Sequence, residues 1–421
     1  MSNERQRIAV IGAGVSGLTT AWLLSEKYDV ELFEAGDYAG GHTNTEMVTA
    51  GGREWPVNTG FIVFNDWTYP NFMKLMDRLG VASEVSDMSF SVDCHSSGLQ
   101  YNGTSLNTLF AQRRNLLNLP FLRMIQEILR FNKESRADLA AGNIADTETL
   151  GEYLNRNGYS RYFRQYYIVP MGAAIWSAPE IVLEQFPIRF FLQFFNNHGM
   201  LSVDDRPTWR VISGGSARYV DAMMERLGER THLNSPVSSV VREPDHVVVT
   251  VNNEHHHFDQ VVFACHSDQA LGMIADPSAE ELDILGAITY QRNDVVLHTD
   301  SSVLPSNRRA WAAWNYFIPQ HSTEPVSVTY NMNVLQNFDE APETFCVTLN
   351  RSQDIDPERI IKRFDYAHPV FTLEAVAAQK RYDEIGGHNR SHFCGAYWFN
   401  GFHEDGVNSA LRVTQALGVE L

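Results

Sequence analysis

Apolar residues follow the pattern of strands in some segments and the spacing of helices in others, and the first forty residues show both. The continuous apolar run at residues 8–11 is typical of a buried strand, and residues 18–24 carry apolar side chains at helical spacing. A second strand is predicted over residues 29–33 and ends at Glu34. Because a glycine-rich turn separates the first strand from the helix, this pattern indicates a βαβ unit in a parallel sheet.

The same strand and helix patterns predict the remaining elements. Hairpins or strands are expected within residues 45–65, 85–102, 232–251 and 259–264. A second group of strands is expected at residues 294–298, 310–316, 327–331, 346–350 and 392–395. Residues 105–200 are mainly helical in pattern, and separate helices are predicted over residues 68–79, 146–157, 219–227 and 408–417. Alternating helical and extended regions of this kind indicate an α/β protein.

The turn after the first strand reads G-x-G-x-x-G. Gly12 permits a tight turn, Gly14 lets a pyrophosphate approach the backbone, and Gly17 lets the helix pack close to the strand. Glu34 follows about twenty residues later, where a carboxylate accepts hydrogen bonds from a ribose diol. Strand, glycine loop, helix and second-strand acid together predict a dinucleotide site at the N-terminus of the helix.

Composition narrows the class of protein. The chain has 421 residues, 44% of them hydrophobic and 20% charged, which is typical of a globular protein with two domains. A formal net charge of −18 argues against a nucleic-acid partner, because phosphate binding requires clustered Lys and Arg. The four scattered cysteines predict a reducing compartment and no metal site. No spanning helix and no signal peptide are recognised, so we expect a cytoplasmic location.

Three segments carry a family resemblance: Glu34 with the following Gly40-Gly41-His42-Thr43, residues 58–63, and residues 401–407. Together they resemble the flavin-containing amine oxidase superfamily. The resemblance implies a Rossmann-like FAD-binding domain of the GR2 type with an interleaved substrate domain of mixed sheet plus helices. It places the FAD-binding domain at residues 1–80, 203–285 and 380–421. The substrate-binding domain then comprises residues 81–202 and 286–379.

The glycine motif and this resemblance together assign the cofactor contacts. The Ser-Gly-Gly-Cys motif for a covalent flavin linkage is absent, so FAD is expected to bind non-covalently. His42 stands where the superfamily commonly has Arg, and no Lys occurs in residues 288–298, where amine oxidases often carry one. The predicted FAD contacts are Gly12, Ala13, Gly14, Ser16, Gly17, Glu34, Ala35, Gly41, His42, Thr59, Gly60, Phe61, Ile62, Val237, Glu404, Asp405 and Val407.

A closer similarity is to a bacterial branch usually described as predicted NAD/FAD-binding proteins. The matching segments include residues 174–177, 297–300, 314–316 and 367–371. That branch is associated with genes for cyclopropane and methylated fatty acids and with furan fatty acid formation. The resemblance therefore implies a fatty acyl substrate, oxidised by hydride transfer to flavin N5. Two alternatives remain open: a flavin amine or amino acid oxidase, and a non-catalytic FAD-binding partner of a lipid-modifying enzyme.

The substrate side is assigned from aromatic and polar residues of the second domain, together with Phe402, which the resemblance places at one position of the aromatic pair of amine oxidases. Trp176, Trp314, Asn315 and Phe402 are predicted to line the substrate site. No catalytic residue is identified, since hydride abstraction needs no dedicated base. If a proton must move, the candidates are His298, Tyr330 and His403.

Residues 113–136 interleave arginines with leucines and phenylalanines on an otherwise acidic chain. Such a stretch either packs as an ordinary helix with a solvated basic face or rests on a membrane surface. The pattern favours the packed helix and leaves peripheral membrane contact open. A small molecule or a lipid is the expected partner, and the sequence does not indicate an oligomeric state.

Overall fold

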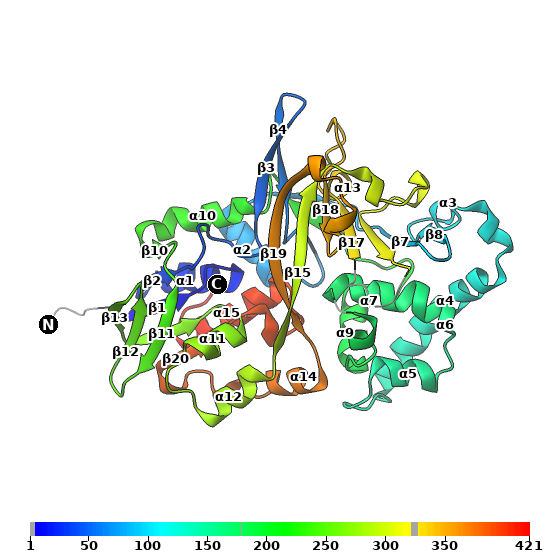
Figure 1. Ribbon diagram of the computed structural model, residues 1–421. Helices are drawn as coiled ribbons and strands as arrows, with labels where there is room; N and C mark the ends of the chain where they lie inside the picture. Colours follow the sequence, from blue (N-terminus) through cyan, green and yellow to red (C-terminus); the bar gives the residue numbers. More distant parts are fainter. Residues whose placement is uncertain (1–4, 178, 321–326) are drawn as a thin grey trace.

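A computed structural model describes residues 5–177, 179–320 and 327–421 of the chain (Figure 1). At one side lies a five-stranded parallel sheet with strand order β10-β2-β1-β14-β20. Its central strands are continuous apolar runs and are buried, as expected for a sheet covered on both faces. The strands are β1 (Arg7–Ile11), β2 (Asp29–Phe33), β10 (Thr231–His232), β14 (Gln260–Phe263) and β20 (Ser391–Phe393).

Helices α1 (Val15–Leu24), α10 (Ala217–Leu227) and α15 (His403–Ala416) pack together beside this sheet. α1 is buried along nearly its whole length because α15 and α10 cover it. The first turn of α15 reaches the first turn of α1 through Gly406, where a Cβ atom would lie 2.6 Å from Val15 Cγ1. The two ends of the chain therefore meet at the start of α1.

Three smaller sheets surround this sheet. Strands β11 (Val237–Arg242), β12 (Val247–Val251) and β13 (Glu254–Phe258) form an antiparallel sheet that shares an apolar core with β1 and β14 and so covers one face of the parallel sheet. A hairpin of β3 (Thr45–Ala50) and β4 (Arg53–Asn58) projects away from it. Strand β9 (Trp209–Ile212) lies between β5 (Val63–Asn65) and β6 (Ser83–Val85). Helices α2 (Pro70–Leu79), α11 (Ser267–Met273) and α12 (Ala279–Gly286) complete this half.

A seven-stranded mixed sheet, with order β19-β15-β18-β17-β16-β7-β8, forms the second half. All pairs are antiparallel except β16 with β7. The chain enters this sheet twice, once with residues 90–102 and again with residues 289–370. The strands are β7 (Phe90–Cys94), β8 (Gln100–Asn102), β15 (Thr289–His298), β16 (Trp314–Ile318), β17 (Ser327–Asn331), β18 (Cys346–Leu349) and β19 (Ile360–Val370).

A helical layer packs beside this sheet (Figure 1). Its core is aromatic and includes Phe121, Phe163, Phe191 and Trp176. Among the described residues, no helix combines the length and the apolar composition needed to cross a bilayer. The helices are α3 (Leu106–Leu109), α4 (Leu119–Ala141), α5 (Leu150–Arg156), α6 (Arg161–Phe163), the π-helical turn η2 (Arg164–Ile168), α7 (Val169–Trp176), α8 (Glu180–Leu183) and α9 (Ile188–Asn197), with α13 (Met332–Leu335) and α14 (Leu373–Gln379) elsewhere.

The α/β fold class with a mixed second sheet is confirmed, and several element predictions need correction. The last helix begins at His403, five residues before the predicted start, because the Asp405 carboxylate accepts a hydrogen bond from the Phe402 N–H and caps it. The strand expected from residue 310 begins at Trp314. Strand β19 was not predicted at all. It is an edge strand with charged residues and Pro369, so it lacks the clean alternation of a half-buried strand.

Candidate functional site

A continuous cavity of about 670 Å³ lies between the two halves of the molecule. One part of its lining comes from the glycine loop after β1, from Glu34 after β2 and from Val237 at the start of β11. The other part comes from helices α7 and α9 and from the seven-stranded sheet. The cavity thus joins a nucleotide-binding region to the interior of the second half.

The three glycines of the loop differ in how much space a side chain would have. Gly12 has φ +103°, and a Cβ there would lie 2.8 Å from Ala264 O. At Gly17 a Cβ would lie 1.8 Å from Gly12 O, so only glycine fits the contact between helix and strand. At Gly14, by contrast, a Cβ would meet nothing within 4 Å, and Gly14 itself lines the cavity. The space in front of Gly14 is therefore open to a ligand.

Gly14 is also the N-cap of α1, and no side chain caps this helix end. The first backbone N–H groups of α1 consequently face the cavity without a side-chain partner, which is the usual binding site for a phosphate anion. Close by, the two oxygens of Glu34 accept hydrogen bonds from Ala13 N and Gly36 N, both at 2.8 Å. These bonds hold the carboxylate at the end of β2, where a ribose would lie.

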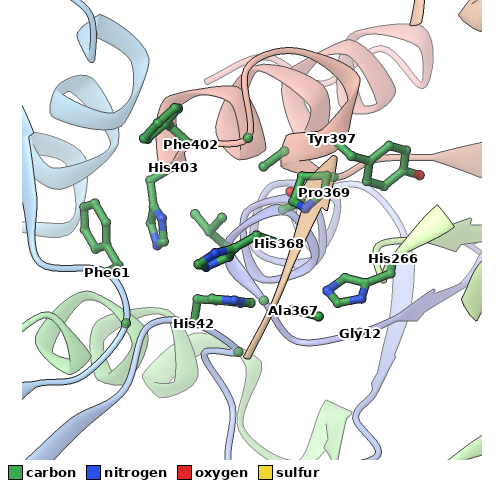
Figure 2. A pocket seen from close by; sticks show the side chains of 18 of the residues that line it. Gly12, His42, Phe61, His266, Ala367, His368, Pro369, Tyr397, Phe402 and His403 are labelled. Carbon is green, nitrogen blue, oxygen red and sulfur yellow. The ribbon is translucent and has the colours of Figure 1, made fainter. Parts of the chain in front are cut away.

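Four histidine rings stand around the middle of the cavity (Figure 2). The rings of His42 and His368 lie 5.4 Å apart, with His403 on one side and His266 on the other. Burial lowers the pKa of His403 to about 3 and that of His368 to about 4, and it also lowers the pKa of His42 and of His266. All four imidazoles are therefore neutral at pH 7.

The hydrogen-bond partners of these rings differ. His403 Nε2 contacts Thr43 Oγ1 at 2.8 Å, and its ring stacks on Phe61 at 3.5 Å. His42 Nε2 is buried and has no hydrogen-bond partner among the described residues. A buried polar atom without a partner costs free energy, so this nitrogen is suited to bind a ligand atom.

The tautomer of His368 follows from a chain of hydrogen bonds. The backbone N–H of Asp294 donates to Asn350 Oδ1 at 3.0 Å, which directs Asn350 Nδ2 to Asn293 Oδ1 at 2.9 Å. Asn293 Nδ2 then donates to His368 Nδ1 at 3.3 Å, and Ser177 Oγ lies 3.2 Å from the same nitrogen. Because Nδ1 is the acceptor, the proton of neutral His368 sits on Nε2. His368 therefore presents an N–H donor to the cavity.

Apolar and aromatic side chains form the wall on the side of the second half. Phe402 stacks on Phe194 at 4.9 Å, and Phe194 in turn stacks on His198 at 3.9 Å. Trp314 and Tyr330 meet edge to face at 4.9 Å. Burial lowers the pKa of His198 to about 4 and leaves it uncharged. Further lining residues on this side are Met88, Ile175, Trp176, Met200, Trp209 and Phe371.

Formal charge is nearly absent from the cavity. Among the described residues that line it there is no Lys, Arg or Asp, and Glu34 is the sole carboxylate. The remaining polar lining groups are the neutral histidines, tyrosines, backbone atoms and a few uncharged side chains such as Gln269 and Asn400. A charged substrate group would have no opposite charge to pair with on the side of the second half.

Most predicted site residues line this cavity. Trp176, Trp314, Phe402, Tyr330 and His403 do so on the substrate side. On the cofactor side, the predicted residues that line the cavity are Gly12, Gly14, Ser16, Glu34, Ala35, Gly41, His42, Gly60, Phe61, Ile62 and Val237. Ala13, Gly17 and Thr59 lie behind the lining. Ala13 N holds Glu34, Gly17 seats the helix, and the Thr59 hydroxyl lies 3.1 Å from that of Tyr366.

Five further predicted residues also lie outside the lining of this cavity. Asn315 bonds within its own sheet, to Ser91 Oγ and to the backbone of Ala312. His298 is buried against Thr348, with Nε2 2.7 Å from Thr348 Oγ1, and does not line this cavity. The remaining three belong to α15: Glu404 accepts hydrogen bonds from the first turn of α2, Asp405 caps its own helix, and Val407 packs in the core.

The residues around the glycine loop and the histidines are suited to bind FAD. The open space at Gly14, the uncapped start of α1, the held carboxylate of Glu34 and the unpartnered His42 Nε2 are suited to phosphate, ribose and ring atoms of a dinucleotide. No described group of three or more His, Cys, Asp or Glu is arranged to hold a metal ion. Fold and cavity together define the class of FAD-dependent oxidoreductases.

Comparison with known proteins identifies the family. The model of the family "Flavin containing amine oxidoreductase" matches residues 15–326, which is more than half of the chain. The chain therefore belongs to the flavin-containing amine oxidoreductase family, and FAD is its cofactor. The fatty acid branch proposed from sequence is a finer assignment that this match does not test.

Among curated proteins, amine oxidase [flavin-containing] A of Canis lupus familiaris is 24% identical over 270 residues, covering 61% of this chain and 49% of that protein. The flavin-dependent L-tryptophan oxidase RebO of Lentzea aerocolonigenes is 27% identical over 286 residues, covering 61% of this chain and 56% of that protein. The chain thus spans about half the length of these relatives.

Solved structures share the fold across nearly the whole chain. Cyclohexylamine oxidase from Brevibacterium oxydans IH-35A superposes with a TM-score of 0.71 and 14% identity, covering 98% of this chain and 99% of that one. A CLA-producing fatty acid isomerase from P. acnes gives a TM-score of 0.69 and 16% identity, covering 97% and 98%. At these identities the likeness extends to the fold alone.

Sequence reasoning missed several lining residues. His368 and Pro369 belong to the unpredicted strand β19. His266 follows β14 and Tyr397 follows the neighbouring strand β20. The segment Ala367–Phe371 was recognised as part of the family pattern, and that was the available signal for His368. His266 and Tyr397 carry no local pattern that marks them as site residues.

Proposed function

We propose that this protein is an FAD-dependent oxidoreductase that desaturates or oxygenates an apolar substrate. A methylated or cyclopropane fatty acyl chain is our leading candidate. The observation that carries the proposal is the uncharged, aromatic wall that shares one cavity with the nucleotide loop. When bound, FAD supplies a hydride acceptor at N5.

The chain's own residues have supporting parts in this proposal. The packed rings of Phe194, Phe402 and Trp176 orient an apolar chain and exclude water from the cavity. His368 offers an Nε2–H donor that can bind a polar atom of the cofactor or the substrate. Tyr330 lines the same cavity, and no described residue forms a hydrogen bond with its hydroxyl, so it is the leading candidate if a proton must be moved.

Amine oxidation is the second candidate, because the family and the curated relatives include amine oxidases. A neutral amine would be compatible with the aromatic wall. An amino acid is disfavoured, since its carboxylate would need a cation and the described lining contains neither Lys nor Arg. A non-catalytic FAD-binding role is the third possibility, and it is the outcome if the bound flavin accepts electrons from no substrate.

Anaerobic titration of the FAD-loaded protein separates these possibilities. Acyl lipids carrying a methyl branch or a cyclopropane ring should bleach the visible absorbance of the flavin, whereas aliphatic amines should leave it unchanged. Bleaching by amines alone would reassign the protein as an amine oxidase. If dithionite bleaches the flavin and no lipid or amine does, a binding role replaces the proposed enzyme activity.

A further inference from the structure

Four exposed leucines gather at one corner of the helical layer. Leu106 is 77% exposed, Leu116 51%, Leu117 87% and Leu119 75%. Leu106 opens α3, Leu119 opens α4, and the other two end the short 3₁₀ helix Arg113–Leu117 that joins α3 to α4. We call these four residues the leucine patch. It lies in the part of the molecule far from the parallel sheet (Figure 1).

Helix formation does not require these leucines to be exposed. Asn118 caps α4 by accepting a hydrogen bond from Phe121 N at 3.4 Å, so Leu117 stands just before the cap. An apolar residue at that position often packs against the first turn as a hydrophobic staple, but here it points to solvent. The core-facing side of α4 is already formed by Phe121, Met124 and Phe131. The leucine patch is therefore additional apolar surface.

The surroundings of the patch are basic on an acidic protein. Residues 94–126 contain no Asp or Glu, although the whole chain has a net charge of −18. The exposed side chain of Arg113 donates to Phe110 O at 2.8 Å, and that of Arg114 donates to Gly98 O at 2.9 Å. These bonds to backbone carbonyls hold both guanidinium groups beside the leucines without neutralising their charge.

A second basic segment lies against the same corner. Asn307 donates to Ala111 O at 2.9 Å and brings the exposed side chains of Arg308 and Arg309 close to α3. Arg113, Arg114, Arg308 and Arg309 form no ion pair with a carboxylate in the described parts of the chain. Exposed leucines on a segment that also carries and adjoins unpaired arginines are the combination that binds anionic lipid surfaces.

We propose that the leucine patch docks the protein on an anionic lipid bilayer, with the four leucines inserted among the acyl chains and the arginines at the phosphate groups. A second copy of the chain is the weaker alternative, because a symmetric contact would place arginine against arginine. The inference concerns a surface separate from the cavity and holds whichever substrate the cavity accepts.

The test measures binding of the FAD-loaded protein to sedimented vesicles. Vesicles of phosphatidylglycerol and phosphatidylcholine in equal parts should bind the protein, and vesicles of phosphatidylcholine alone should bind it weakly. The double variant Leu117→Ser/Leu119→Ser should lower the partition coefficient at least about tenfold. Arg113→Gln/Arg114→Gln should lower it about fivefold per arginine at low salt and less at high salt.

Matched controls change the same residue types elsewhere. Leu282→Ser removes an exposed leucine from α12, and Arg230→Gln removes an exposed arginine outside the patch, so neither should alter vesicle binding. Unchanged flavin absorbance and melting temperature show that the patch variants remain folded. Absence of binding to the anionic vesicles, or equal binding by patch variants and wild type, would overturn the proposal. Loss of a dimer in the leucine variant, without vesicle binding by the wild type, would assign the patch to a second copy.

Discussion

At the residue scale, two glycines of one loop have different physical reasons to be glycine. Gly17 is needed by the fold, since its missing side chain lets α1 approach the turn at Gly12 O. Gly14 has φ −73° and open space around the position of a Cβ, so the fold accepts alanine there. Its side-chain space belongs to the cavity and is suited to the pyrophosphate.

The two alanine variants should consequently fail in different ways. Gly14→Ala should fold with an unchanged melting temperature as apoprotein and bind FAD at least about tenfold more weakly, a loss of about 1.4 kcal/mol. Gly17→Ala should be destabilised by several kcal/mol or fail to fold, because its Cβ would overlap a backbone oxygen. Thermal unfolding and FAD titration of the apoprotein measure both effects. Normal FAD affinity in Gly14→Ala would place the pyrophosphate elsewhere.

A second prediction at this scale concerns His368. Replacing Asn293 with Asp puts a carboxylate beside His368 Nδ1, which stabilises the protonated ring. The pKa of His368 should rise from about 4 toward its ordinary value, and the Nδ1 position should become a donor. NMR titration of the labelled ring reports both the pKa and the tautomer.

The wild-type ring should be neutral at pH 7, with its proton on Nε2. The control variant Asn293→Ala should remove the partner without raising the pKa to the same extent. An Nδ1–H tautomer in the wild-type protein would contradict the hydrogen-bond chain that begins at Asp294 N.

At the scale of elements, a helix can be capped by a residue that is distant in the sequence. Tyr69, the N-cap of α2, provides no side-chain hydrogen bond to this helix. The cap comes instead from Glu404 on α15, whose carboxylate accepts from Asn71 N at 3.1 Å and Phe72 N at 2.8 Å. A residue assigned to the cofactor by family resemblance thus joins two helices beneath the cavity.

Glu404→Ala should lower the free energy of unfolding by about 1–3 kcal/mol, because two backbone N–H groups lose their buried acceptor. FAD affinity should remain within about twofold of the wild type, because Glu404 does not line the main cavity. Denaturant unfolding and FAD titration measure the two quantities. Glu229→Ala, at an exposed glutamate, is the control and should change neither. A large loss of FAD affinity with unchanged stability would assign Glu404 to the cofactor site.

At the scale of the whole molecule, buried neutral histidines link stability to pH. Burial lowers the pKa to about 4 for four of them and to about 3 for His403. The four are His198, His298, His368 and His392. Between these values and the ordinary pKa of 6.5, the unfolded chain binds more protons than the folded chain. Three carboxyls act in the opposite direction: burial raises the pKa of Asp405 to about 7 and also raises the pKa of Glu404 and Asp93. They are fewer than the seven histidines, since burial also lowers the pKa of His42 and His266.

Stability should therefore be greatest above about pH 7 and fall as the pH drops from about 6.5 toward 4, where each histidine contributes up to about 1.4 kcal/mol per pH unit. Melting temperatures measured across this range, on the FAD-loaded protein and the apoprotein, check the expectation. His392→Gln, remote from the described cavity lining, should flatten the curve without loss of FAD. A melting temperature that stays constant down to pH 4 would contradict the neutral buried state of these rings.

Some elements and site residues could be predicted from the sequence, and others could not. The strands of the βαβ unit, the glycine loop and Glu34 depend on local periodicity and on short-range backbone geometry, which the sequence displays directly. Phe61 and Phe402 were placed through a resemblance, because aromatic residues alone do not distinguish a core from a cavity wall. β19 was missed because an edge strand with charges and a proline has no clear period.

By itself, then, the sequence determined the α/β class, the nucleotide loop and the acidic character of the chain, since each follows from neighbouring residues or from composition. Only the tertiary structure decided that four neutral histidines surround the middle of one cavity, whose wall on the side of the second half carries no charge, and that Glu404 caps a helix. It also showed that four leucines at one corner remain exposed. These features depend on contacts between residues hundreds of positions apart, and on which side of an element is covered, so no local pattern encodes them.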